Sequence, residues 1–107
     1  MKINVTTQYG IKLLKFLATK DTHTTLKSFT EVTGLSLSLT EQVARKLRVS
    51  GLVTVKRGPG GGLTIAQPIE TISLLDVEYA VGGKKQERET HEVKFNSYIS
   101  KLMIAEL

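Results

Sequence analysis

The glycine-rich run GPGGG at positions 58–62 restricts the fold more than any other segment of this chain. It contains four glycines in five residues, and glycine loses more backbone freedom on folding than any other residue. On either side, LVTVK (52–56) and LTIAQ (63–67) alternate apolar and polar side chains and are rich in β-branched residues. This pattern predicts two strands joined as a β-hairpin, with the glycine run at its tip.

The glycine run does not match the known phosphate-binding loops. A P-loop requires Lys-Ser/Thr after its glycines, and a dinucleotide fingerprint opens a helix, whereas this run is followed by the strand pattern LTIA. Two alternatives remain: a flexible tip without a role, or a loop that approaches a DNA groove. A tight hairpin needs only two turn residues. The longer tip beside Lys56 and Arg57 favours DNA, because glycine permits close approach to phosphates.

Two helices are predicted before the hairpin from their apolar periodicity. The first covers 7–19, with Lys12 and Lys15 one turn apart on the solvent side. The second starts after Thr25, a suitable N-cap residue, and ends at Gly34, a suitable C′ residue. Its buried face is expected to consist of Leu26, Phe29 and Val32.

The segment 35–51 predicts a third helix, which ends at Gly51. Ser38 and Glu41 have the S-x-x-E spacing of a capping box. A core-facing stripe with the helical spacing 0, 3, 4 and 7 consists of Thr40, Val43, Ala44 and Leu47. The opposite face consists of Ser38, Glu41, Gln42, Arg45 and Arg48. Two helices with a short link outline a helix-turn-helix.

A short helix is predicted over 73–81 and a final helix over 86–107. The final helix is expected to dimerise through an apolar stripe, although folding back onto its own domain is an alternative. This stripe consists of Phe95, Tyr98, Ile99, Leu102 and Met103. The predicted fold class is therefore mainly α with a small β-hairpin wing, a winged helix-turn-helix in 1–82 followed by a C-terminal dimerisation helix in 83–107.

Charge and composition narrow the function. Residues 1–68 hold ten Lys/Arg against three Asp/Glu, whereas 69–107 hold five against seven, so the N-terminal part is expected to face an anionic polymer. The chain has no cysteine, which excludes disulfides and thiolate metal sites. We expect no cofactor, no metal, no catalytic residues and no membrane segment, and a cytoplasmic, nucleoid-associated protein. Only Glu87, His91 and Glu92 suggest even a weak metal set.

Double-stranded DNA is the expected partner. The start of a recognition helix points side chains into the major groove, where glutamate pairs with cytosine, glutamine with adenine and arginine with guanine. The candidate DNA-binding residues are Ser38, Thr40, Glu41, Gln42, Arg45, Lys56, Arg57, Gly58, Pro59, Gly60 and Gly61.

Four segments of the sequence resemble the bacterial winged-helix regulators of the iron–sulfur cluster regulator type (IscR/NsrR/BadM-like). They are YGIKLLKFLA, LSLSLTEQVARKLRVSGLV, VKRGPGGGLTIAQP and ISLLDVEYAV. The resemblance implies a homodimeric, sequence-specific transcription factor in which Ser38, Glu41 and Arg57 match the base-contacting residues. Where that family carries a cysteine-bearing loop, this chain has KKQERETHEVK and no cysteine, so cluster sensing is not expected.

The sequence therefore predicts a transcriptional regulator, acting as a repressor that binds a palindromic operator as a homodimer. Its occupancy would follow its own level or an unidentified protein partner. Two alternatives remain open: an architectural or plasmid-partition-type protein that coats repeated DNA sites, and a winged-helix interaction module that no longer binds DNA.

Overall fold

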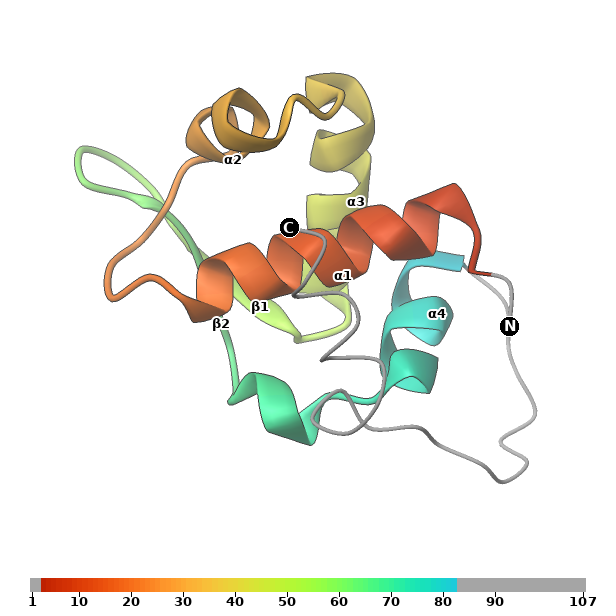
Figure 1. The fold of residues 1–107 in the computed structure, drawn as a ribbon. Helices are drawn as coiled ribbons and strands as arrows, with labels where there is room; N and C mark the ends of the chain where they lie inside the picture. The colour runs from red at the N-terminus through yellow and green to blue at the C-terminus, as the bar shows by residue number, and fades with distance from the viewer. Residues whose placement is uncertain (1–2, 83–107) are drawn as a thin grey trace.

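The computed structural model describes residues 3–82, which form a winged helix-turn-helix domain (Figure 1). The prediction of a mainly helical domain with a hairpin wing is confirmed. The helix predicted over 86–107 lies outside the described residues, together with its apolar stripe and Glu87, His91 and Glu92, and the division at 82/83 stays a prediction. None of the helices in 3–82 has the length and apolar content of a membrane span. The elements are α1 (Val5–Ala18), α2 (Leu26–Thr33), α3 (Leu37–Val49), β1 (Val53–Lys56), β2 (Gly62–Ile65), the 3-10 helix η1 (Ile69–Thr71) and α4 (Leu74–Gly82).

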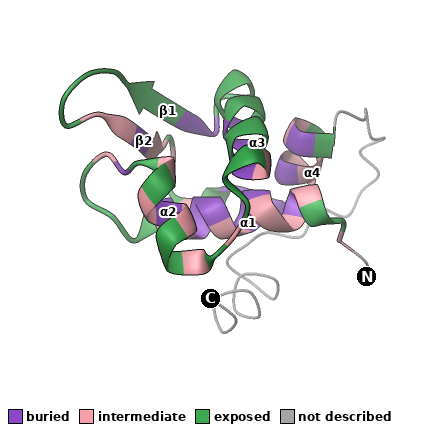
Figure 2. Ribbon diagram, turned by 90° about the horizontal axis from the view of Figure 1, so that it is seen from above, coloured by how far each residue is buried: buried purple, intermediate pink, exposed green. Residues whose placement is uncertain are grey.

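Helix α1 is the centre of the domain, and both α3 and α4 pack against it. It carries buried residues along most of its length, whereas the wing loop and the outer face of α3 are exposed (Figure 2). At Gly10 the helices approach closely, because a Cβ atom there would lie 2.9 Å from Cγ1 of Val77. Phe16 and Phe29 join α1 to α2 in an edge-to-face contact with ring centroids 5.2 Å apart.

The prediction that Lys15 lies on the solvent side of α1 is wrong. Lys15 is only 4% exposed, and desolvation lowers its pKa below the ordinary value of 10.5. Lys15 can be buried because the four-carbon stem of a lysine side chain packs along apolar surface as an apolar side chain does.

Helix α2 begins and ends at the predicted residues, but its buried face is narrower than expected. The hydroxyl of Thr25 accepts a hydrogen bond from the N–H of Ser28 (3.1 Å), and Gly34 adopts φ 75° at the C-cap. Phe29 is buried, whereas Val32 is 71% exposed, so the prediction that Val32 belongs to the core is wrong. Phe29 is the one residue of this eight-residue helix that is fully buried.

The wing is an antiparallel pair of strands, as predicted, with Val53 opposite Ile65 and Lys56 opposite Gly62. A third segment supports it: Thr24 and Leu63 exchange both backbone hydrogen bonds, of 2.9 and 2.8 Å. This bridge joins the link between α1 and α2 to the second strand. The wing is therefore attached to the helical body on its inner edge, and its tip projects beside α2 (Figure 1).

Candidate nucleic-acid interface

The outward face of α3 carries a row of exposed polar side chains. Ser38, Glu41, Gln42 and Arg45 together line a shallow depression of about 480 Å³. The opposite face of the same helix is buried in the core, as predicted. Helix α3 follows α2 after the short link 34–36, so α3 is the second helix of a helix-turn-helix, the one that enters the major groove in such motifs. The row can offer donors and acceptors to base edges.

The N-terminus of α3 begins two residues earlier than the predicted capping box. The side chain of Ser36 accepts a hydrogen bond from the N–H of Leu39 (3.2 Å) and is the N-cap. The prediction of a capping box at Ser38 and Glu41 is therefore wrong. Both side chains lie on the exposed surface, and neither makes a hydrogen bond or ion pair with another described residue. They are free to meet a partner.

A reciprocal capping box does occur, but at the start of α4. The hydroxyl of Ser73 accepts from the N–H of Asp76 (3.0 Å), and the carboxylate of Asp76 accepts from the N–H of Ser73 (2.9 Å). Ser73 is fully buried. The S-x-x-acid spacing therefore forms a capping box at the start of α4, away from the outward face of α3.

Thr40 is not available to DNA, contrary to its prediction as a contact residue. It is 1% exposed, and its hydroxyl donates a 2.6 Å hydrogen bond to the carbonyl oxygen of Ser36. Thr40 instead belongs to the core-facing stripe, at the position that its helical spacing also predicts. Its hydroxyl is satisfied within the helix end, so burial carries no polar penalty.

The tip of the wing holds its basic residues outward. Arg57 is exposed, as are Lys56 before it and Pro59 after it. Gly58 and Gly60 adopt φ 91° and 76°, a left-handed conformation that other residues rarely adopt. At Gly61 a Cβ atom would lie 2.2 Å from the carbonyl oxygen of Lys56. Two separate constraints, left-handed backbone and close approach, therefore explain why the tip consists of glycine.

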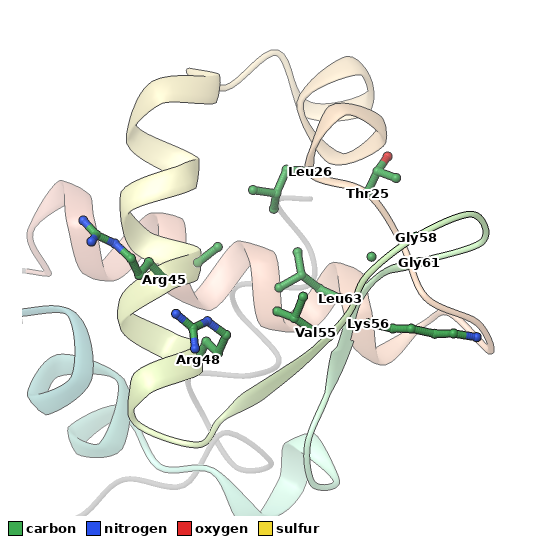
Figure 3. Close-up of a pocket in the computed structure, with 11 residues that line it drawn as sticks. Thr25, Leu26, Arg45, Arg48, Val55, Lys56, Gly58, Gly61 and Leu63 are labelled. Carbon is green, nitrogen blue, oxygen red and sulfur yellow. The ribbon is translucent and has the colours of Figure 1, made fainter.

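A cavity of about 470 Å³ lies between α3 and the wing (Figure 3). Arg45 and Arg48 line it from α3, whereas Val55 and Leu63 line it from the strands. The sequence predicts that Arg48 lies on the outward face of this helix, but it does not mark Arg48 as a candidate DNA contact. Its place beside the wing follows from the packing of the hairpin on α3, which periodicity within one helix does not reveal.

The charge of this surface is strongly positive. Four of its side chains are basic (Arg45, Arg48, Lys56 and Arg57) and one is acidic (Glu41). Such a surface attracts a polyanion. Within residues 3–82 no three His, Asp or Glu side chains are grouped as metal ligands would be.

Comparison with known proteins adds independent findings. The model of the Rrf2 family, described as an iron-dependent transcriptional regulator, matches residues 3–103. The HTH-type transcriptional regulator IscR of Cereibacter sphaeroides is 38% identical over 85 residues, which cover 76% of this chain and 55% of that protein. This chain thus spans about half the length of that curated relative.

Solved structures show the same fold. CymR, the global cysteine regulator of B. subtilis, superposes with a TM-score of 0.72 at 27% identity, covering 99% of this chain and 86% of that one. The oxidized form of CymR from Staphylococcus aureus gives 0.69 at 32% identity, covering 99% and 82%. IscR from T. potens gives 0.70 at 27% identity, covering 99% and 73%.

An iron–sulfur cluster of the kind held by cysteine thiolates does not fit this chain. Such clusters are bound by cysteine side chains, and the sequence contains none.

Proposed function

The chain belongs to the Rrf2 family of DNA-binding transcriptional regulators, which are not enzymes, and we propose that it is a sequence-specific repressor that occupies a two-fold symmetric operator as a homodimer. One observation carries the proposal: Arg45 of the second helix and Lys56 and Gly58 of the wing line the same cavity. Helix and wing therefore face a single partner surface together. A DNA duplex, with its major groove beside a phosphate strand, matches that pairing of elements.

In the proposed complex, the outward row of α3 reads bases in the major groove. Glu41 accepts from the amino group of cytosine, Gln42 pairs with adenine and Arg45 with guanine. Ser38, in the first turn of the helix, contacts a base edge or the neighbouring phosphate. Each of these side chains is exposed.

The wing supplies contacts beside the major groove. Arg57 reaches into the flanking groove, and Lys56 neutralises a phosphate. The backbone N–H groups of Gly58 and Gly60 lie next to phosphate oxygens because glycine permits close approach. The N–H of Gly61 donates a hydrogen bond to the carbonyl oxygen of Gly58 (2.9 Å), so Gly61 supports the shape of the tip. Pro59 at the tip packs against the sugar-phosphate backbone.

A homodimer would place two copies of α3 about 34–36 Å apart, one turn of DNA. The residues proposed to form the dimer, Phe95, Tyr98, Ile99, Leu102 and Met103, lie outside the described part of the chain. Without cysteine-ligated clusters, occupancy of the operator in the cytoplasm would follow the amount of the protein or a further ligand.

Selection of binding sites from random double-stranded DNA tests this proposal most directly. We expect one inverted repeat whose half-sites lie one helical turn apart, and a complex mass equal to two chains on one duplex. Arg57→Ala should weaken binding to the selected site about tenfold or more, whereas Lys12→Ala, a matched charge change on α1, should not. If the protein binds the selected site no more tightly than random DNA at moderate salt, the proposal of a sequence-specific regulator is wrong. A long continuous footprint would instead indicate a protein that coats DNA.

A further inference from the structure

The cavity between α3 and the wing has more apolar lining than a phosphate-binding groove needs. Its volume of about 470 Å³ falls within the ~300–1,000 Å³ typical of small-molecule sites, which are lined mainly by apolar side chains with a few placed polar groups. Val55 remains 48% exposed although it is apolar. The apolar lining consists of Leu26, Ala44, Val55 and Leu63.

The positive charge of the cavity is concentrated on one side. Arg48 extends from α3 beside the strands, whereas the side chains of Arg45 and Lys56 both point away from the apolar lining (Figure 3). Neither Asp nor Glu is among the lining residues. Among the residues that the structure describes, none forms an ion pair with either guanidinium group. The cavity therefore combines an apolar lining with the unpaired guanidinium of Arg48 at one edge.

We propose that this cavity binds a small organic acid, a carboxylate attached to an aromatic or branched apolar body. The carboxylate accepts paired hydrogen bonds from the guanidinium of Arg48, a geometry that arginine provides and lysine does not. The apolar body covers half-buried Leu26 and exposed Val55 and removes their exposed surface from water. A phosphodiester alone would satisfy the arginines but leave that apolar surface without a matching group.

Occupation of the cavity would exclude DNA, and this step rests on the proposed function. The acid lies between the reading helix and the wing, and it neutralises Arg48, part of the basic surface that a duplex would otherwise meet. The ligand and DNA then bind in competition. At a ligand concentration ten times its Kd, the apparent Kd for the operator should rise about tenfold.

The probe for this site is 2-naphthoate, with uncharged 2-naphthamide as its control. The chain contains no tryptophan, so naphthyl fluorescence can be followed without indole emission. We expect saturable binding of 2-naphthoate and at least tenfold weaker binding of the amide. Arg48→Gln should weaken 2-naphthoate about tenfold by removing a charge-assisted hydrogen bond. Lys27→Gln, which makes the same charge change on exposed α2, should leave the Kd unchanged.

The outcomes separate this inference from the proposed function. Absence of saturable 2-naphthoate binding, in protein that still binds its selected operator, overturns the site. Equal losses in Arg48→Gln and Lys27→Gln, with both variants folded by circular dichroism, also overturn it. Ligand binding that leaves operator affinity unchanged refutes the competition. If no DNA sequence is preferred, the repressor proposal fails, while the fluorescence titration still decides whether the acid binds.

Discussion

The phenolic oxygen of Tyr9 accepts a 3.2 Å hydrogen bond from the backbone N–H of Ser36. Tyr9 lies in α1, and Ser36 is the N-cap of α3. The contact therefore ties the central helix of the core to the residue at which the reading helix begins. It fixes the entry of α3 from outside that helix, where no local sequence pattern reveals it.

Tyr9→Phe should lower the free energy of unfolding by about 1 kcal/mol or less, because a typical hydrogen bond contributes about that much and water can reach this N–H. Operator affinity should fall a few-fold for all sequences alike, since the reading side chains themselves are unchanged. Urea unfolding and fluorescence anisotropy with operator and point-substituted duplexes measure the two effects. A change in base preference, with overall affinity retained, would show that the hydroxyl acts on DNA directly.

Ser36 and Ser38 provide a matched pair for testing the helix start. Ser36→Ala should cost about 1 kcal/mol of stability, because it removes the N-cap acceptor of α3. Ser38→Ala should change stability by less than about 0.5 kcal/mol, as for an exposed site away from caps, while lowering operator affinity. Urea unfolding of both variants measures this difference. Equal losses of stability would mean that the helix begins elsewhere in solution.

The misplaced helix start shows what the local sequence leaves undecided. Serine and leucine alternate through SLSLTE (36–41), so Ser36 and Ser38 both have the chemistry of an N-cap. The acid three residues after Ser38 favours the wrong one. The choice depends on tertiary contacts, including the hydrogen bond from Ser36 to Tyr9. By contrast, the stripe from Val43 to Leu47 was predictable, because helical periodicity alone selects it.

The wing shows the same division between local and long-range information. Its two strands are predictable from the alternation of apolar and polar residues, and its tip is predictable from the glycine run. The bridge between Thr24 and Leu63 joins residues far apart in sequence, and no pattern marks Thr24 as a strand residue. Arg48 likewise becomes part of the cavity only once the hairpin packs on α3. The elements that carry the candidate site were therefore predictable, whereas the burial of Thr40, the place of Arg48 and the shape of the site were not.

Glu41→Ala should relax base preference with little loss of total affinity. A carboxylate among cations repels phosphate, so its value lies in accepting a hydrogen bond from one base. We expect discrimination at one position of each half-site to fall about tenfold, within the ~1–3 kcal/mol of one base contact. Glu31→Ala, the same charge change at an exposed position of α2, is the control. Parallel selection experiments measure both, and a uniform loss across all sequences would contradict base reading by Glu41.

Gly62→Ala should destabilise the domain more than Gly60→Ala. A Cβ atom at Gly62 would lie 2.6 Å from the carbonyl oxygen of Thr24, and the φ of 143° is nearly exclusive to glycine. At Gly60 a Cβ meets nothing within 4 Å, so only the left-handed backbone cost of about 1–2 kcal/mol applies. We expect a loss of roughly 3 kcal/mol for Gly62→Ala. Equal losses in urea unfolding would show that the link to Thr24 adjusts freely.

Buried Lys15 should make stability depend on pH in the alkaline range. Desolvation lowers the pKa of Lys15 in the folded state below 10.5, so between these two values the unfolded chain binds more protons than the folded one. The free energy of unfolding therefore rises as pH increases through this window. Below the folded pKa, both states are protonated and the contribution of Lys15 no longer changes.

Lys15→Met tests this directly, because methionine keeps an unbranched apolar stem and has no titrating group. The variant should be at least as stable as the wild type at pH 7 and should lack the rise attributed to Lys15 at higher pH. Lys12→Met, one turn earlier on α1 and only partly buried, should keep that rise. Urea unfolding at several pH values up to about 10.5 measures the slopes. If the rise in the free energy of unfolding with pH persists in Lys15→Met but disappears in Lys12→Met, the titrating group is Lys12 and the prediction for Lys15 is wrong.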